Sequence, residues 1–250
     1  MKVLCLILSL LAGQAWGAFA TGTTVLLDFE DNLTDSSDQG KNATLISTAN
    51  YQTNGAWHGA KAFRSSAGSF TVPTTTINTA GTIELSFRHE TGAGGNKILY
   101  SIAAASGSRA LEIYCINGAV FYAYGNGVGG TNAPFFNTVA NSTNYYIKDT
   151  WDGAGNRQIW LGVWTTAGTV TLTQYFNSTA SSLATPSAVY FANSSVGAGI
   201  DGGYDWLRIR NVHDNTATVT IDPVASAVTQ LSPYILNSNS NRMMPLWWSR

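Results

Sequence analysis

Short runs of Val, Ile, Thr, Tyr, Phe and Trp recur along the chain and alternate with clusters of Gly, Asn, Ser and Thr. Residues 82–88, Thr-Ile-Glu-Leu-Ser-Phe-Arg, alternate apolar and polar side chains, the period of a strand with one face in a core. We expect the other face of this strand to be exposed to solvent or to a ligand. No helical periodicity follows residue 20, so the pattern predicts β-structure throughout. The predicted strands are 25–29, 61–64, 69–72, 82–88, 97–103, 110–116, 119–124, 145–151, 158–164, 169–175, 188–191 and 204–212.

Two turns between these strands carry their own signals. Asn117-Gly118 separates two β-type runs and is the pair of residues that tolerates the positive φ angles of a two-residue hairpin. Asp152-Gly-Ala-Gly-Asn156 predicts a longer turn between two later strands. About a dozen strands joined in this way predict an all-β fold, a two-sheet antiparallel sandwich of the jelly-roll type.

The first twenty residues are typical of an export signal. Lys2 is followed by an apolar run over 3–12 and by small residues at Ala15, Gly17, Ala18 and Ala20. The apolar run is shorter than the about 20 residues of a membrane span. We therefore expect 1–20 to be a signal peptide and the mature protein to be secreted or held at a cell surface, without a membrane span. An uncleaved anchoring helix is the alternative.

The chain changes character beyond residue 212. Residues 216–222 could form one more strand, and 223–250 are rich in Ser and Asn and end near Trp247 and Trp248. One interpretation is a loose tail, because termini are poorly ordered unless they dock. The other is that the paired tryptophans anchor the tail on this domain or on a partner, since two exposed indole rings are costly in water.

The net charge and the cysteine content exclude some classes of partner and rule out disulfides as the source of stability. The net charge is −1 with 13 Lys and Arg in 250 residues, so nucleic acids and anionic membranes are poor partners. Outside the signal the chain has one cysteine, Cys115, which excludes an intramolecular disulfide in the mature protein. We expect Cys115 to be buried and inert, because a free cysteine usually packs as a small apolar group.

Five segments taken in order resemble the laminin-G-like members of the concanavalin A-like lectin/glucanase superfamily. They are an Asp-Phe-Glu-Asp opening with an Asp-Ser-Ser turn, a Gly-Ala-Trp-His-Gly segment, a Thr-Ile-Glu-Leu-Ser-Phe strand, a Trp-Asp-Gly-Ala-Gly-Asn hairpin and a Tyr-Asp-Trp-Leu-Arg-Ile-Arg closing strand. These segments lie at 28–40, 55–63, 81–87, 150–160 and 204–210.

The resemblance covers about residues 24–212 and departs from the family at Arg88, where many members have Trp. It implies a concanavalin A-like jelly roll over 21–212, followed by a C-terminal extension over 213–250. It also implies that the first and last strands lie side by side.

Catalysis of the glucanase type is not expected. Retaining and inverting glycosidases need a pair of carboxylates, which that branch places on alternate residues of one strand. The four Glu, at 30, 84, 90 and 112, include none two residues from an Asp in a middle strand. The three His, at 58, 89 and 213, show neither metal-ligand spacing nor a nucleophile motif. We expect no enzyme, while a glycoside hydrolase of unusual type remains open.

The resemblance implies a structural Ca²⁺ between the first and last strands. Carboxylates would come from Asp28 or Glu30 and from Asp205, and loop carbonyls near Gly55 or Gly59 would complete the oxygen shell. The alternative is that Asp205 caps a turn and that the acidic residues at 31, 35 and 38 only solvate the first loop.

Sugar binding uses aromatic faces for the rings and polar groups for the hydroxyls. The candidates are Trp57, Tyr124, Asn126, Trp151 and Tyr204, and the Gly-rich loop 125–132 is a candidate rim. We therefore predict a non-catalytic carbohydrate-binding or adhesion module with a glycan or polysaccharide as partner. The alternative is a structural or assembly protein of a cell surface, filament or virion, docked or self-assembled through its C-terminal tail.

Overall fold

The computed structural model describes residues 20–56, 59–65, 68–77, 79–90, 95–104, 109–125, 132–164, 170–179, 186–194, 197–217 and 219. Residues Thr21–Val219 form one compact unit. Across these described ranges, no helix combines the length and the hydropathy needed to cross a bilayer.

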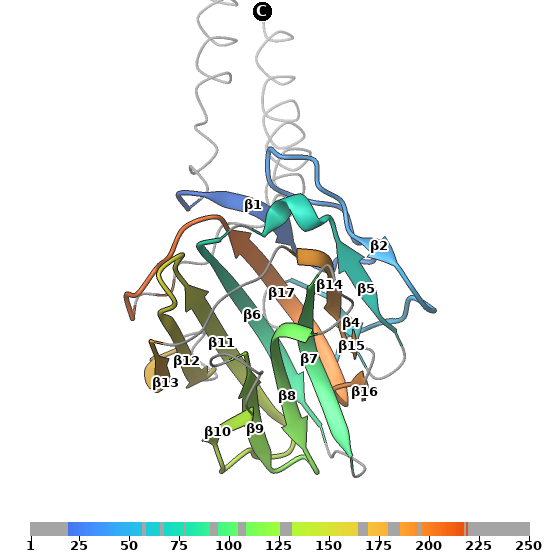
Figure 1. Ribbon diagram of the computed structural model, residues 1–250. Coiled ribbons are helices and arrows are strands. Elements are labelled where there is room, and N and C mark those ends of the chain that lie inside the picture. The colour runs from blue at the N-terminus through green and yellow to red at the C-terminus, as the bar shows by residue number, and fades with distance from the viewer. Residues whose placement is uncertain are drawn as a thin grey trace, which may run out of the picture. The chain divides into compact units, whose positions relative to one another are not determined.

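Two β-sheets pack face to face in this unit (Figure 1). The A sheet has the order β13-β12-β11-β6-β17-β4-β3, with β1 also paired to β17. Its strands are β1 (Thr23–Leu27), β3 (Tyr51–Gln52), β4 (Ala62–Arg64), β6 (Gly81–His89), β11 (Thr143–Trp151), β12 (Arg157–Val163), β13 (Thr173–Ser178) and β17 (Gly202–Arg210).

The B sheet has the order β10-β9-β8-β7-β14-β5-β2, and a short pair, β15 and β16, joins it at β7. Its strands are β2 (Thr44–Leu45), β5 (Phe70–Val72), β7 (Asn96–Ala104), β8 (Arg109–Ile116), β9 (Val120–Tyr124), β10 (Asn132–Phe136), β14 (Pro186–Phe191), β15 (Asn193–Ser194) and β16 (Gly197–Gly199). A single 3₁₀ turn, η1 (Thr74–Thr76), follows β5 among the described segments.

The architecture confirms the predicted jelly-roll sandwich. The first and last strands pair antiparallel, with Leu27 opposite Leu207, as the resemblance implied. Pairing is antiparallel except between β16 and β7, which run parallel. Sequence patterns missed β2, β3, β10, β15 and β16. Four of these have only two or three residues and lack a clear alternation, and Pro134 within β10 argued against a strand there.

Both predicted hairpin turns are present. Asn117 and Gly118 have φ angles of 51° and 65°, and the turn closes where the backbone N of Ala119 donates to the carbonyl of Ile116 at 3.0 Å, just before β9 begins. Asp152 organises the other turn, because its Oδ1 accepts hydrogen bonds from the backbone N of Ala154 and of Asn156, at 2.9 and 2.8 Å. An aspartate side chain that binds the backbone two residues ahead is a common way to fix such a turn.

The core lies between the inward faces of the two sheets. Cys115 is fully buried within it, as predicted, and burial raises the pKa of its thiol to about 11. Aromatic rings fill one part of the core, where Phe70 stacks on Phe191 with centroids 5.0 Å apart. Strand alternation supplies the inward residues, which include Val25, Leu27, Ile83, Leu85, Phe87, Ile147, Ile159, Leu207 and Ile209 from the A sheet and Ile102, Leu111, Ile113, Phe121, Ala123 and Val189 from the B sheet.

Candidate functional site

One row of residues crosses the outward face of the B sheet from strand to strand. Thr71 on β5 lies opposite Tyr190 on β14, Tyr190 opposite Ser101 on β7, and Ser101 opposite Glu112 on β8. Glu112 in turn lies opposite Tyr124 on β9, and Tyr124 opposite the first residue of β10. We call this set the Glu112 row; its members are Thr71, Tyr190, Ser101, Glu112, Tyr124 and Asn132.

The row faces away from the core because both neighbours of each central member face inward. Leu111 and Ile113 flank Glu112, and both belong to the core cluster. Phe121 and Ala123 on β9 do so as well, which leaves Tyr124 on the outer face. Six strands spaced about 4.8 Å apart make the row about 24 Å wide. The row is therefore long enough to contact several units of an extended ligand.

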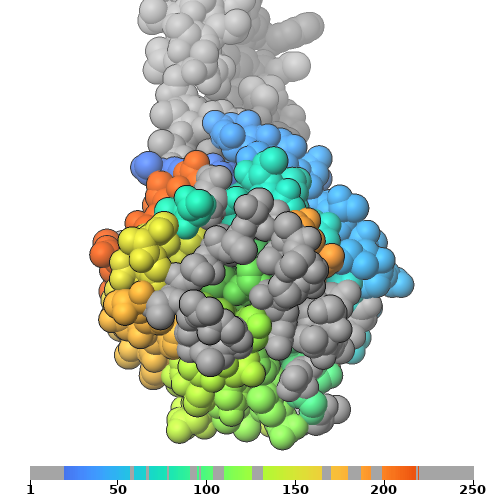
Figure 2. Space-filling view, viewed as in Figure 1, coloured from blue at the N-terminus to red at the C-terminus, as the bar shows by residue number. Residues whose placement is uncertain are grey.

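Aromatic rings lie beside the row. Tyr114 on β8 and Tyr122 on β9 are opposite one another and stack, with centroids 5.5 Å apart and ring planes at 15°. Tyr122, Tyr124 and Tyr190 are each partly exposed, whereas Glu112 is fully buried at the centre of the row. Figure 2 looks onto this face, with the green atoms of β8 and β9 near its middle. The exposed part of this face combines flat apolar rings with the hydroxyl groups of its tyrosines, and the carboxyl group of Glu112 lies beneath the surface.

A buried ion pair on the inward face of the A sheet binds the end of β9. Arg157 on β12 donates from Nη2 to Asp149 Oδ2 on β11 at 2.6 Å, and both side chains have 0% exposure. Arg157 Nη1 also donates to the backbone carbonyl of Tyr124, and Tyr100 donates its hydroxyl to Asp149. The A sheet thereby holds the backbone of a row residue in the B sheet.

The charged state of this pair follows from its surroundings. Burial alone disfavours the guanidinium, but the adjacent Asp149 carboxylate raises the pKa of Arg157 above its ordinary value. Burial, followed by the negative charge of Asp149, raises the pKa of Tyr100 well above its usual range, so its hydroxyl keeps its proton and remains a donor.

The structure separates the predicted ligand residues. Tyr124 lies in the Glu112 row. Trp57 and Asn126 lie outside the described residues. Trp151 and Tyr204 are only 2% and 0% exposed and belong to the core cluster, so neither forms part of the candidate site.

Local packing explains why these two aromatic residues are internal. Trp151 shares the inward phase of Tyr145 and Ile147 on β11 and lies over Gly81, where a Cβ would come within 2.6 Å of the indole. The hydroxyl of Tyr204 donates to the carbonyl of Leu99 at 2.5 Å, so its polar end is satisfied inside the core.

Sequence reasoning did not select Tyr190, Ser101, Glu112, Tyr114 or Tyr122. The available signal was the alternation of β8, where Leu111, Ile113 and Cys115 take one face and leave Glu112 and Tyr114 on the other. That signal gives a face for each strand, but it does not say which strands are neighbours.

The carboxylates predicted to hold Ca²⁺ bind protein donors at the first strand. Asp28 Oδ2 accepts from Ser36 Oγ at 3.2 Å. Glu30 Oε1 accepts from the backbone N of Ala60 and of Lys61, at 2.7 and 3.2 Å. Asp205 is fully buried at a register shift between β17 and β6.

No three Asp, Glu, His or Cys side chains gather around a common point in the part of the chain that the structure describes. Asp28 and Glu30 use these hydrogen bonds to fasten loops at the first strand, and the calcium site stays a prediction. Asp35 works in the same way, since its carboxylate accepts from the backbone N of Leu26 at 2.9 Å and of Lys41 at 2.7 Å.

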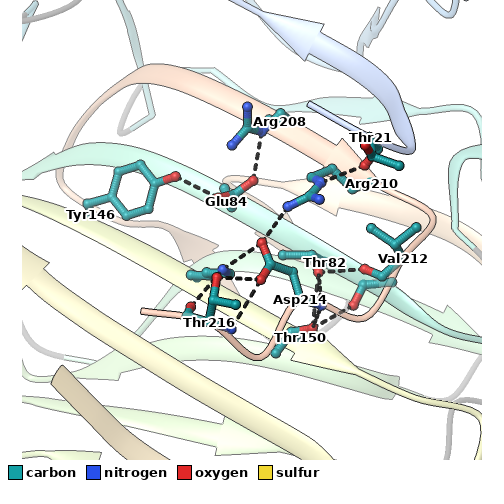
Figure 3. A network of polar contacts seen from close by, with 12 residues as sticks. Thr21, Thr82, Glu84, Tyr146, Thr150, Arg208, Arg210, Val212, Asp214 and Thr216 are labelled. Atoms are coloured by element: carbon teal, nitrogen blue, oxygen red, sulfur yellow. Dashed lines mark hydrogen bonds and ion pairs between the residues drawn. The ribbon is translucent and has the colours of Figure 1, made fainter. Parts of the chain in front are cut away.

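The outward face of the A sheet carries a buried charge network (Figure 3). Glu84 on β6 accepts from Arg208 Nε at 2.7 Å and from the Tyr146 hydroxyl at 2.9 Å, and none of these three side chains is more than 1% exposed. The expectation that this face of β6 would be wet or ligand-facing is wrong. A carboxylate can be buried there because it is paired and hydrogen-bonded.

Asp214 fastens the chain to this network just beyond β17. Its Oδ2 pairs with Lys148 Nζ at 2.8 Å and with Arg210 Nη1 at 2.5 Å, and its backbone N donates to Thr150 Oγ1 at 2.9 Å. The first residues after β17 thus dock on the A sheet, as Figure 3 shows. Thr216, Ala217 and Val219 are not in a strand. Residues 220–250, including both tail tryptophans, lie outside the described part.

Comparison with known protein families finds no matching family model, and no curated protein matches the sequence. Solved structures do match. Domain 4 of AbnA, a GH43 extracellular arabinanase from Geobacillus stearothermophilus, solved with arabinotriose, gives a TM-score of 0.57 at 13% identity over 76% of this chain and 93% of that one. The binding domain of botulinum neurotoxin serotype G gives 0.55 at 13% identity, over 77% of this chain and 48% of that one.

A sialidase from Trypanosoma rangeli, in complex with 2,3-difluorosialic acid, gives a TM-score of 0.55 at 14% identity, over 78% of this chain and 31% of that one. The chain thus spans nearly all of the arabinanase domain but less than half of the toxin and sialidase chains. At this level of identity the similarity shows the fold, a β-sandwich of lectin-like type.

Proposed function

We propose that this protein is a secreted, non-catalytic glycan-binding module of the laminin-G-like, concanavalin A-like type. Its binding surface is the Glu112 row with the adjacent tyrosines. The observation that carries the proposal is the row itself, which places Tyr190, Ser101, Glu112 and Tyr124 side by side on four neighbouring strands. Residues 1–20 supply the export signal in this proposal.

The chemistry of the row suits a sugar. Tyrosine rings offer apolar faces to the C–H surfaces of a sugar ring, and their hydroxyls accept or donate hydrogen bonds. Ser101 and Glu112 lie between the rings in the row but are buried, so the polar contacts to a sugar come from the hydroxyls of the partly exposed tyrosines. Neighbours in fold support the same class, since the arabinanase domain was solved with arabinotriose and the sialidase with 2,3-difluorosialic acid.

The acidic residues of this face support a role without catalysis. The strands of the B sheet contain a single acidic residue, Glu112. Glycoside hydrolysis by either common route needs a second carboxylate at about 5–10 Å. Binding requires no such partner.

The test is a glycan array probed with residues 21–250 and with three single variants. Tyr124→Ala and Tyr190→Ala are expected to weaken binding at least tenfold, because each removes one ring of the row. Tyr175→Ala is the matched control, since Tyr175 is 43% exposed on β13 of the other sheet. Binding that survives both row variants, or that falls equally with the control, would refute the proposed surface.

The assembly role, in which the protein docks or self-assembles through its tail, remains the alternative. It rests on residues 220–250, and no described contact favours it. Deleting 223–250 separates the two functions. A glycan-binding module should remain a folded monomer with unchanged glycan affinity, whereas an assembly protein should lose oligomers that light scattering detects in the full chain.

A further inference from the structure

Tyr124 is the last residue of β9, and its side chain is partly exposed on the outward face of the B sheet. The ends of secondary-structure elements fray more readily than their centres. A side chain that is mobile before binding must be ordered when the ligand arrives, and this ordering lowers the affinity. The contacts that fix the backbone on either side of Tyr124 therefore bear on how well its ring can bind.

Arg157 fixes this strand end from the opposite sheet. Its Nη1 donates to the backbone carbonyl of Tyr124, while its Nε and Nη2 bind the carboxylate of Asp149 at 3.0, 3.2 and 2.6 Å. The guanidinium is planar and its donors point in fixed directions, so the carbonyl is held at a defined place relative to Asp149. Tyr100 on β7 donates its hydroxyl to the same carboxylate. One buried ion pair thus connects β7 and β9, the strands on either side of β8.

Gly125 fixes the chain on the other side of Tyr124. It is buried, and its φ angle of 97° is a conformation that favours glycine. A Cβ at this position would lie 2.2 Å from the carbonyl oxygen of Ala110 on β8. That oxygen belongs to the backbone of a paired strand, so it cannot move aside without disturbing the sheet. The chain therefore leaves β9 in close contact with β8, along a path that any larger residue would change.

On the basis of the proposed function, in which the Tyr124 ring contacts a sugar, we propose that Arg157 and Gly125 are positioning residues for that ring. Neither touches the ligand, because both are buried. They hold the end of β9 so that the ring already lies in the Glu112 row before a glycan binds. If the ring had to be ordered during binding, the affinity would be about twofold to tenfold lower.

The experiment measures Kd at pH 7 for the oligosaccharide that residues 21–250 bind most tightly on the glycan array. The first variant is Arg157→Lys. It keeps a positive charge beside Asp149, but one ammonium group cannot reproduce the fixed donor directions of the guanidinium that hold both the carboxylate and the carbonyl of Tyr124. We expect Kd to rise about twofold to tenfold.

The second variant, Gly125→Ala, acts on the other side of Tyr124. It should raise Kd at least tenfold, because the backbone next to the ring must shift away from Ala110. Gly153→Ala is the matched control. Gly153 is exposed in the turn after β11, and the nearest described atom would be 3.9 Å from a Cβ there, so Kd should stay unchanged.

A double-mutant cycle with Tyr124→Ala separates positioning from a general loss of structure. If Arg157 and Gly125 act through the ring, then adding Arg157→Lys or Gly125→Ala to Tyr124→Ala should cost no further affinity. A general loss of structure would weaken binding by Tyr124→Ala as much as it weakens binding by the wild type. Thermal melts establish which variants are folded at the temperature of the titration, and one folded variant is enough for the cycle.

A measurement on the unbound wild type needs no variant. The backbone order parameter of Tyr124, from ¹⁵N relaxation, should be close to about 0.85, the value of a rigid backbone. A value below about 0.6 would mean that the strand end is mobile before binding, and it would overturn the inference.

Three further results would overturn the inference while leaving the proposed function intact. They are an unchanged Kd in a folded Arg157→Lys or Gly125→Ala variant, additive losses in the double variants, and an equal loss in Gly153→Ala. Failure of the wild type to bind any glycan would instead refute the proposed function.

Discussion

The Arg157–Asp149 pair gives a sharp test of how the sandwich is held together, through the variant Arg157→Met. Arg157 makes three contacts with the carboxylate, at 3.0, 3.2 and 2.6 Å, and a fourth with the backbone carbonyl of Tyr124. Methionine fills part of the volume but supplies no donor. Asp149, which has no exposed area, would be left as an uncompensated buried charge.

Removing one partner of such a pair costs about 3–5 kcal/mol. Whole domains are stable by only about 5–15 kcal/mol, so the variant should lose a large part of its stability. For a domain of this size each kcal/mol lowers Tm by about 2–4 °C, which predicts a fall of about 6–20 °C. Urea unfolding followed by tyrosine and tryptophan fluorescence at pH 7 measures the change directly.

The double variant Asp149→Asn/Arg157→Met separates charge from packing. The double variant removes the unpaired charge of residue 149 and keeps an acceptor for the Tyr100 hydroxyl. It should therefore recover about 2 kcal/mol of the unfolding free energy that the single variant loses. If single and double variants are equally unstable, lost packing is the cause and the reasoning is wrong.

The remaining predictions concern the pairing of Asp214 with the A sheet, the burial of Cys115 and the predicted calcium site. Burial alone would raise the pKa of Asp214, but hydrogen bonds from Lys148 and Thr216 hold that pKa well below its ordinary value. The resulting stability is present at neutral pH and lost as the pH falls below about 4. Asp214→Asn should therefore lower the free energy of unfolding by about 2 kcal/mol at pH 7, and that free energy, measured by urea unfolding at a series of pH values, should fall less steeply toward acid pH than in the wild type. Cys115 should resist thiol reagents at pH 8 until the chain is unfolded, and rapid labelling of the native protein would contradict its burial. A chelator should leave Tm unchanged, because Asp28 and Glu30 bind protein donors; a fall in Tm would instead support the calcium site.

Local patterns were enough to predict the class of fold. The alternation in 82–88 and 110–116 identified strands and their inward faces, and Asn117-Gly118 identified the hairpin between β8 and β9. These signals are local because a strand exposes its two faces at a period of two residues, and a turn is set by the φ angles its own residues tolerate. The burial of Cys115 was predicted from the apolar character of a free cysteine.

The phase of a strand was harder to predict, because register shifts change it. Residues on either side of Asp205 pair with consecutive positions of β6, so one extra residue stands between Tyr204 and Trp206. Tyr204 consequently faces the core, where sequence reasoning expected a ligand contact. A bulge of this kind depends on the partner strand, and a single strand's sequence does not reveal it.

The sequence by itself determined that this protein is built from amphipathic strands, and it identified Tyr124 as a candidate ligand residue. Only the tertiary structure decided that Glu112 is its neighbour, and that Tyr190 and Ser101 join the same row from strands far apart in the chain. Side-chain alternation is written into each strand locally. Strand order and register depend on pairing and packing across the whole sandwich, and the same holds for the buried partners of Glu84 and Asp149.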